Sequence, residues 1–464
     1  MKVCVIGTGY VGLTTSVALA YLGHQVIGVD KDTSKIELLL KHQSPIREYG
    51  LERLMEMAWG NLRFSTSTRD SVSDAGIIII AVGTPSGAGG GADTAYVETA
   101  AREIAQGMKP DSSYTVVVKS TVPVGSNKVV SGVVREVLDG RGLRNKTSVG
   151  IVSNPEFLRE GMALNDTLYP DRIVVGAETQ EQADSIRRLY REILEQTFEA
   201  PHELPRPEHY RLPPFISTDP ASAEMIKYAA NAFLALKISY INEIAGLCEK
   251  VGADAIEVAR GIGLDHRIGQ GFLSAGIGWG GSCLPKDTSA LLASGKEHGY
   301  SMPITEAARE VNARQRDLAI EKIHQALHGV CGRTLGILGL SFKPGTDDVR
   351  DSPALDLVRI FATLGARIRV HDPLALENTR AVLDGLKGFE IEYFEDPYKL
   401  VSGADALILA TDWPEYKLLD WARIAGLMGL PLILDGRNLL DPKEMKRAGW
   451  SYTGVGRPIH SNWL

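Results

Sequence analysis

Cysteine is scarce in this chain, and its spacing excludes two kinds of structure. Only 4 of the 464 residues are cysteines, and they are far apart in the sequence. They are Cys4, Cys248, Cys283 and Cys331. A disulfide framework requires several closely placed cysteines, and a zinc site requires clusters with short, characteristic spacings. We therefore expect no disulfide, no bound metal and a reducing compartment.

The chain also has no excess of positive charge and no long apolar run. Its formal net charge is −7, which argues against nucleic-acid binding. No apolar run approaches the roughly 18 residues that a membrane-spanning helix requires. The chain begins directly with a predicted strand, so no signal peptide is visible. We expect a cytoplasmic protein that binds neither nucleic acid nor membrane.

Glycine, in contrast, occurs in a pattern that carries chemistry. Residues 7–12 read Gly-Thr-Gly-Tyr-Val-Gly, between an apolar strand predicted at 2–6 and an apolar helical pattern that continues to residue 20. A second predicted strand follows at 25–29 and ends in Asp30. Such glycines let the backbone approach a pyrophosphate at the helix N-terminus, and the acid binds the ribose 2′-OH. The pattern predicts an NAD site that disfavours NADP, because Asp30 would repel a 2′-phosphate.

Alternating strands and helices predict an α/β fold with several domains. The length predicts about three of them, and 44% hydrophobic with 23% charged residues is typical of globular proteins. We expect a Rossmann domain at 1–200, a proline-rich insert at 201–216, a central helical domain at 217–325 with a long helix over 221–251, and a second doubly wound, Rossmann-like domain at 326–464. The second sheet lacks the glycine pattern after its first strand, so it should bind a nucleotide of another kind.

Two predicted strands of the first domain, at 77–82 and 115–119, are each followed by a candidate ligand-binding loop. Thr84 and Pro85 follow the first strand, and Ser120 and Thr121 follow the second. Open α/β sheets bind ligands beyond the carboxyl ends of their strands. The loop from Gly87 to Gly91 lies beside these positions, and the sequence leaves open whether it contacts a cofactor or is a plain surface turn.

Cys283 lies in the most chemically distinctive segment, Gly-Trp-Gly-Gly-Ser-Cys-Leu-Pro-Lys-Asp at 278–287. Pro285 suits the first position of a helix, which would place Cys283 just before a helix N-terminus. The helix dipole there favours thiolate over thiol. Asp287 would lie in the first turn, within reach of the sulfur. The segment predicts a nucleophilic cysteine; the alternative is a buried structural one.

Two further pairs of polar residues, each four residues apart, are compatible either with a catalytic role or with an ordinary helix surface. Lys227 and Asn231 share one face of the predicted long helix, where they could stabilise an oxyanion or relay a proton. The same spacing is typical of a solvated helix face. Glu156 and Glu160 are also four residues apart, and glutamates so spaced on one helical turn are common at surfaces.

Together, these motifs resemble the UDP-glucose/GDP-mannose dehydrogenase family over nearly the whole chain. The segments that carry the resemblance are 7–12, 120–123, 154–161, 227–231 with 238–239, 278–287, 342–343 and 435–437. Residues 263–269, with Phe272 and Leu273, are similar to the UDP-glucose branch of the family. The insert from Ala200 to Phe215 departs from the pattern. Its five prolines predict an extended loop, in which His202 and His209 are surface residues rather than metal ligands.

The resemblance implies an NAD-dependent four-electron oxidation of UDP-glucose to UDP-glucuronate through a thiohemiacetal and a thioester on Cys283. The implied catalytic residues are Cys283, Lys227, Asn231, Asp287, Glu156, Glu160 and Thr121. The implied cofactor contacts are Gly7, Gly9, Tyr10, Val11, Gly12, Asp30, Lys35, Thr84, Pro85, Thr121 and Arg350. The implied substrate contacts are Glu156, Phe157, Leu158, Glu160, Lys227, Asn231, Arg267, Phe272, Gly280, Lys343 and Arg437.

The resemblance also implies a homodimer or larger homo-oligomer formed through the middle helices, in which Arg267 reaches the sugar site of a neighbour. Three other functions stay open. One is the same oxidation of a UDP-N-acetylhexosamine or of GDP-mannose. The second is a two-electron hydroxyacid dehydrogenase of the 6-phosphogluconate type, against which Cys283 argues because such enzymes need no nucleophilic cysteine. The third is a non-catalytic scaffold with the same fold.

Overall fold

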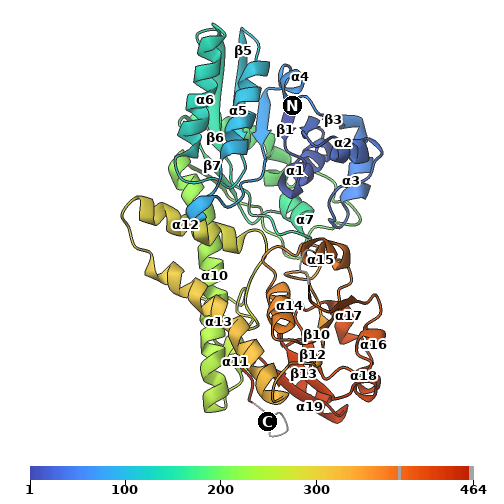
Figure 1. The fold of residues 1–464 in the computed structure, drawn as a ribbon. Coiled ribbons are helices and arrows are strands. Elements are labelled where there is room, and N and C mark those ends of the chain that lie inside the picture. The colour runs from blue at the N-terminus through green and yellow to red at the C-terminus, as the bar shows by residue number, and fades with distance from the viewer. Residues whose placement is uncertain (385–387, 459–464) are drawn as a thin grey trace. The chain divides into compact units, whose positions relative to one another are not determined.

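A computed structural model describes residues 1–384 and 388–458 and divides the chain into two compact units, Met1–Ala230 and Asn231–Leu464 (Figure 1). Each unit contains a parallel-dominated sheet covered by helices. The expected α/β class with two Rossmann-like sheets and a helical central region is confirmed. Every helix among the described residues is too short or too polar to span a bilayer.

The first unit contains an eight-stranded sheet in the order β3-β2-β1-β4-β5-β6-β7-β8. Neighbouring strands are parallel except at the β6–β7 pair. The strands are β1 (Lys2–Ile6), β2 (Gln25–Val29), β3 (Leu62–Ser65), β4 (Ile77–Ile80), β5 (Ser112–Val118), β6 (Thr147–Ser153), β7 (Ile173–Gly176) and β8 (Phe215–Thr218). All four isoleucines of β4 are buried, as expected for a central strand with both faces covered.

Helices cover both faces of this sheet. One apolar core joins it to α1 (Tyr10–Tyr21), α2 (Thr33–Leu40), α3 (Leu51–Ala58), α7 (Ala163–Leu168), α8 (Gln180–Leu189) and α9 (Arg191–Glu195). A second core joins it to α4 (Thr68–Val72), α5 (Ala95–Gly107) and α6 (Ser126–Gly140). In Figure 1, α5 and α6 lie side by side along one face.

The proline-rich insert packs on the first unit as an irregular strap. No helix or strand lies between the end of α9 at Glu195 and the start of β8 at Phe215, so the expected extended loop is confirmed. Leu204 is buried, and its carbonyl accepts a hydrogen bond from the Tyr169 hydroxyl at 2.8 Å. His202 and His209 are exposed, as expected for surface residues.

The long helix is α10 (Pro220–Val251), whose first residues belong to the first unit and whose remainder belongs to the second. The second unit continues with α11 (Ala255–Gly263), α12 (Leu284–Glu297) and α13 (Pro303–Ala326). Its parallel sheet has the order β11-β10-β9-β12-β13-β14. The strands are β9 (Thr334–Leu338), β10 (Arg367–His371), β11 (Ile391–Tyr393), β12 (Ala406–Leu409), β13 (Leu432–Asp435) and β14 (Ser451–Gly454).

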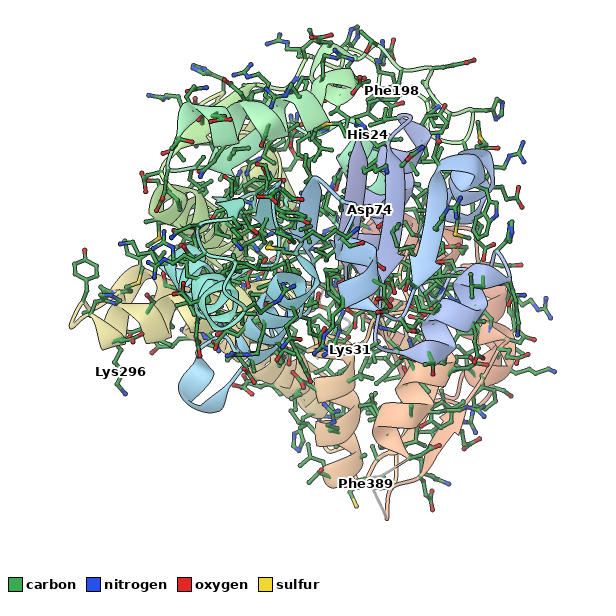
Figure 2. All side chains as sticks on the ribbon, turned by 90° about the horizontal axis from the view of Figure 1, so that it is seen from above. His24, Lys31, Asp74, Phe198, Lys296 and Phe389 are labelled. Atoms are coloured by element: carbon green, nitrogen blue, oxygen red, sulfur yellow. The ribbon has the colours of Figure 1, made fainter. Side chains whose placement is uncertain are left out.

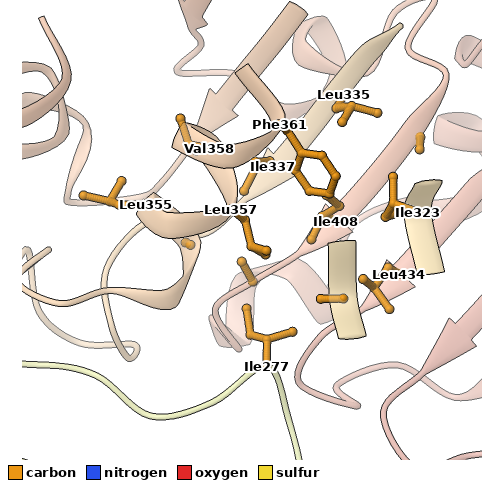
Figure 3. Packing of buried hydrophobic residues seen from close by; sticks show 14 of the residues in the cluster. Ile277, Ile323, Leu335, Ile337, Leu355, Leu357, Val358, Phe361, Ile408 and Leu434 are labelled. Atoms are coloured by element: carbon orange, nitrogen blue, oxygen red, sulfur yellow. The ribbon is translucent and has the colours of Figure 1, made fainter. Parts of the chain in front are cut away.

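The helices that accompany this second sheet are α14 (Pro353–Thr363), α15 (Leu376–Leu383), α16 (Pro397–Leu400), α17 (Pro414–Lys417), α18 (Trp421–Leu427) and α19 (Pro442–Arg447). The core between α14 and the sheet is shown in Figure 3, where Phe361 lies among buried side chains of β9, β12 and β13. Ile277, which is fully buried, belongs to the same cluster. It anchors in this core the loop that leads to Cys283.

Candidate active site

The glycine turn after β1 forms a cradle that larger residues would fill. Gly7 has φ +100°, and a Cβ at this position would lie 2.6 Å from the Ala81 carbonyl oxygen. A Cβ on Gly12 would overlap the carbonyl of Gly7, whereas one on Gly9 would meet open space. Helix α1 begins at Tyr10, so the N-terminus of this helix adjoins an open backbone. This geometry fits a pyrophosphate.

Asp30 follows β2 and is tied to the glycine turn. It accepts hydrogen bonds from the Thr8 amide at 2.9 Å and hydroxyl at 2.8 Å, and Lys35 Nζ lies 3.8 Å away. Burial alone raises the pKa of Asp30, but these hydrogen bonds, one from the Asp32 amide and the Lys35 charge together hold the pKa below its usual range. Asp30 is therefore a carboxylate at neutral pH. Lys31, labelled in Figure 2, is instead paired with Glu103 at 2.8 Å.

The loops after β4 and β5 are joined at the same edge of the sheet. The Thr84 hydroxyl, in the residue before Pro85, donates to the Thr121 carbonyl at 2.8 Å. Thr121 also lines a small cavity of about 10 Å³, together with Glu224 and Lys227. This volume is about what one water molecule needs.

Lys227 and Glu156 form a buried ion pair. Lys227 Nζ lies 2.9 Å from Glu156 Oε1, and their side chains are 4% and 8% exposed. The Leu158 amide donates to Glu156 Oε2 at 2.6 Å, and the Lys227 ammonium lies 5.6 Å from the centre of the Phe157 ring. Burial alone raises the pKa of Glu156, but the Lys227 charge and these hydrogen bonds outweigh it and lower the pKa. A charged pair is thus held inside the first unit.

The helical-surface interpretation of Glu156 and Glu160 is wrong. Residues 154–159 form neither helix nor strand, because Pro155 and the capture of the Leu158 amide by Glu156 direct this backbone into a loop. Glu156 is buried and Glu160 is half-buried. For Lys227, the solvated-face alternative also fails, since its side chain is buried against Glu156.

Two buried charged residues near this pair were missed by sequence reasoning. Lys119 Nζ donates to Asn154 Oδ1 at 3.2 Å, and its charge contributes to the lowered pKa of Glu156. Glu224 accepts hydrogen bonds from the amides of Gly125 at 2.6 Å and Asn127 at 2.8 Å, at the start of α6. A lysine at the end of an apolar strand was a usable signal for Lys119, whereas the sequence offered none for the partners of Glu224.

Cys283 is the N-cap residue of α12, Pro285 is the second residue of that helix, and Asp287 lies in its first turn. The expected position of Cys283 before the helix and of Asp287 in its first turn is confirmed, whereas Pro285 is the second helical residue and not the first. Ser282 Oγ lies 3.5 Å from Cys283 Sγ. Asp287 is 1% exposed and binds Asn231 Nδ2 at 2.6 Å and the Lys286 ammonium. Asn231 therefore holds the carboxylate of the cysteine helix.

The other cysteines have different surroundings. Cys4 and Cys248 are buried, Cys331 is exposed, and Cys283 is intermediate. Burial raises the pKa of the Cys4 thiol to about 12, and it also raises the pKa of Cys248. Both are therefore protonated and unreactive near neutral pH.

The remaining predicted cations of the second unit contact neighbouring groups of their own unit. Arg267 binds Asp265 through a bidentate contact, with a side chain 79% exposed. Arg350 binds Asp348 in the same way, and Lys343 lies 5.5 Å from the centre of the Phe342 ring. Arg437 donates to the carbonyls of Ala410 and Gly278, both at 2.9 Å.

Two predicted substrate contacts lie at positions where the backbone restricts the side chain. Phe272 has φ +63° and is 41% exposed. A Cβ on Gly280 would overlap the carbonyl of Asp351, so this residue must be glycine for the loop to lie against α14.

Comparison with known proteins identifies the relatives of this chain. The NAD binding, central and UDP binding domain models of the UDP-glucose/GDP-mannose dehydrogenase family match residues 1–194, 221–314 and 336–442. The UDP-glucose 6-dehydrogenase TuaD of Bacillus subtilis is 44% identical over 98% of this chain and 93% of its own length. The UDP-glucose 6-dehydrogenase of Rhizobium meliloti is 43% identical over 99% and 100%.

Solved structures agree with this relationship. A UDP-glucose dehydrogenase from Pyrobaculum islandicum superposes with a TM-score of 0.86 at 38% identity and covers 98% of both chains. A UDP-D-ManNAc dehydrogenase from Pyrococcus horikoshii superposes with a TM-score of 0.83 at 27% identity, over 99% of this chain and 100% of its own. The chain is therefore a member of the UDP-glucose/GDP-mannose dehydrogenase family and an NAD-dependent oxidoreductase.

Proposed function

We propose that the protein oxidises UDP-glucose to UDP-glucuronate in two NAD-dependent steps, with Cys283 as the nucleophile. The observation that carries this proposal is the position of Cys283 at the start of α12, ahead of a buried Asp287 held by Asn231. The helix N-terminus favours a thiolate. The names of the relatives at 43–44% identity support UDP-glucose as the substrate.

The first oxidation needs a base for the alcohol and a positive charge beside its oxygen. NAD, when bound, accepts the hydride in each oxidation. Lys227, which pairs with the Glu156 carboxylate, stabilises the alkoxide, and Asn231 donates to the same oxygen. Gly7, Gly9, Tyr10, Val11 and Gly12 hold the cofactor at the start of α1; Asp30, Lys35, Thr84, Pro85, Thr121 and Arg350 complete its site.

The second oxidation takes place on the protein. The Cys283 thiolate adds to the aldehyde carbon, and the oxygen takes up a proton, which gives a thiohemiacetal. This carbon then loses its hydride and its hydroxyl proton and becomes a thioester. A water adds to the carbonyl, the C–S bond breaks, and the thiolate and the carboxylate product are released. Asp287, Thr121, Glu156 and Glu160 position the alcohol and this water and accept their protons.

We propose three functional divisions, at 1–200 for NAD, 217–325 for the nucleophile and dimerisation, and 326–464 for the UDP moiety. Lys343 and Arg437 contact the diphosphate or the sugar, and Phe157, Leu158, Phe272 and Gly280 shape the sugar pocket. Of the third division, residues 385–387 and 459–464 lie outside the described part of the chain.

A homodimer through α10 is supported by an exposed apolar stripe on that helix. Phe233, Tyr240 and Leu247 recur every seven residues and are 61%, 51% and 59% exposed, and Val251 continues the stripe at 67%. Such a stripe on a helix marks a protein interface. Lys237 ties the segment that contains Arg267 to this helix through the Ile268 carbonyl at 3.0 Å. We propose that Arg267 crosses the interface and completes the sugar site of the partner subunit.

The stoichiometry of NADH production tests the four-electron reaction. UDP-glucose should yield two NADH per molecule with no free aldehyde, because Cys283 holds the intermediate. UDP-N-acetylglucosamine and GDP-mannose, assayed in parallel, should be poor substrates. Cys283→Ser should lose several powers of ten in turnover, since serine is not ionised near neutral pH, while Cys331→Ser serves as the control. One NADH per sugar, or near-normal turnover of Cys283→Ser, would refute the proposal.

Cofactor choice tests Asp30. Asp30→Ala should improve kcat/KM for NADP relative to NAD, because it removes a carboxylate from the place where the 2′-phosphate would lie. Lys31→Ala is the control, since Lys31 is paired with Glu103 and should not affect the ratio. An unchanged NAD/NADP ratio in Asp30→Ala would show that Asp30 does not contact the ribose.

Subunit complementation tests Arg267. Arg267→Ala should raise the KM for UDP-glucose and leave the KM for NAD nearly unchanged. An equal mixture of Arg267→Ala and Cys283→Ser subunits, dissociated and reassembled, should recover about one quarter of the wild-type activity at low UDP-glucose, because half of the dimers are hybrids with one intact site. Absence of recovery in verified hybrids would mean that the arginine does not act across the interface.

A further inference from the structure

The loop that leads into Cys283, residues 276–282, is held almost entirely by groups from other elements of the second unit. It contains four glycines and no regular structure of its own. Its start is fixed by the Gly276 amide, which donates to Asn242 Oδ1 at 2.8 Å, and by Ile277, which is fully buried (Figure 3). Near its end, the Gly281 amide donates to the Arg350 carbonyl at 3.1 Å.

Asn312 of α13 holds the middle of this loop. Its Oδ1 accepts from the Trp279 amide at 2.7 Å, and its Nδ2 donates to the Trp279 carbonyl at 3.0 Å. Both residues are buried, at 5% and 6% exposure. One side-chain amide thus pairs with the N–H and the C=O of one residue, as a neighbouring strand would. A pair of buried hydrogen bonds of this kind allows the backbone little freedom.

The surroundings allow neither side of this contact to shift easily. Gly278 has φ +106°, and a Cβ there would lie 2.7 Å from Asn312 Oδ1. The Trp279 indole donates to Ser239 Oγ of α10 at 3.0 Å. On the helix side, Arg316 binds the Asn312 carbonyl at 2.9 Å and Asp356 of α14 at 2.7 Å. The two hydrogen bonds between the Asn312 side chain and the Trp279 backbone, called the clamp below, therefore connect the loop to the core of the second unit.

We propose that Asn312 is a positioning residue for Cys283, which fixes the thiol at the start of α12 by clamping the Trp279 backbone four residues before it. This inference rests on the proposed role of Cys283 as the nucleophile. A thiol that leaves its position by about 1 Å loses much of its reactivity toward a bound aldehyde. Asn312 contributes to the reaction through this geometry alone.

The test uses Asn312→Asp, which changes one atom and keeps the size of the side chain. Its ionised carboxylate can still accept from the Trp279 amide, but it repels the Trp279 carbonyl. At pH 8 we expect a loss of kcat of about tenfold or more, with the KM for NAD within about twofold of wild type. As the pH falls, the introduced carboxyl gains a proton that it can donate to the Trp279 carbonyl, so activity relative to wild type should rise. The thermal midpoint of Asn312→Asp, measured at the same pH values, checks that the protein stays folded throughout, since an ionised buried carboxylate also lowers stability.

A chemical readout follows the thiol directly. Iodoacetamide labelling, quantified for each cysteine by peptide mass spectrometry, compares Cys283 with the exposed Cys331 of the same sample. We expect the Cys283/Cys331 rate ratio to fall by about threefold or more in Asn312→Asp. Gln315→Ala removes another buried side chain of α13 and should leave the ratio within about twofold. If Asn312→Asp does not fold, Gly278→Ala, whose methyl would displace Asn312 Oδ1, should lower the same ratio.

The outcomes separate this inference from the proposed function. A labelling ratio and a kcat that both stay within twofold of wild type in Asn312→Asp would overturn the clamp. A shifted ratio with unchanged kcat would support the clamp and contradict the role of Cys283 in turnover, which Cys283→Ser tests independently.

Discussion

One constraint applies to both sheets: the segments that follow parallel strands all begin at the same edge of the sheet, where the carboxyl ends of the strands lie. In the first unit, Asp30, Thr84, Thr121 and Glu156 follow β2, β4, β5 and β6, so residues up to 126 positions apart in the sequence share that edge. Because the strands are buried on both faces by apolar contacts, this edge is where polar side chains can gather without weakening the core. The Lys227–Glu156 pair lies there, and its charges are held by protein groups rather than by solvent.

Each sheet has an aspartate after the equivalent strand, but the two aspartates differ in burial and in hydrogen bonding. Asp30 follows β2, and Asp372 follows β10, in sheets of similar strand order. Asp30 receives its hydrogen bonds from Thr8 and Asp32 and remains partly exposed. Asp372 is 2% exposed and accepts from the amides of Leu340, Ser341, Leu374 and Ala375 and from the Trp413 indole. A carboxylate with all of these hydrogen bonds has no capacity left to bind ribose hydroxyls. The second sheet therefore lacks both the glycine turn and the available acid of an NAD site.

The sequence predicts features that depend on near neighbours. The strand predicted at 77–82, the long helix predicted over 221–251 and the position of Cys283 before a helix follow from apolar runs, periodicity and proline. The sequence left two interpretations of Glu156 open, because spacing does not reveal that its carboxylate accepts from a nearby amide and pairs with a distant ammonium. Lys119 and Asn312 were missed because their partners are 35 and 33 residues away, and such contacts exist only once the sheet and helices have packed.

The central claim is that the buried Lys227–Glu156 ion pair supports the chemistry of the proposed site. Glu156→Gln tests this claim, because glutamine has nearly the same shape as glutamate but no charge. Removal of one partner leaves a buried ammonium uncompensated. The measurement is kcat for UDP-glucose oxidation together with the KM for NAD and the thermal midpoint. The account predicts a kcat lower by about a hundredfold or more, with an unchanged KM for NAD. A folded Glu156→Gln protein with kcat within threefold of wild type would contradict it.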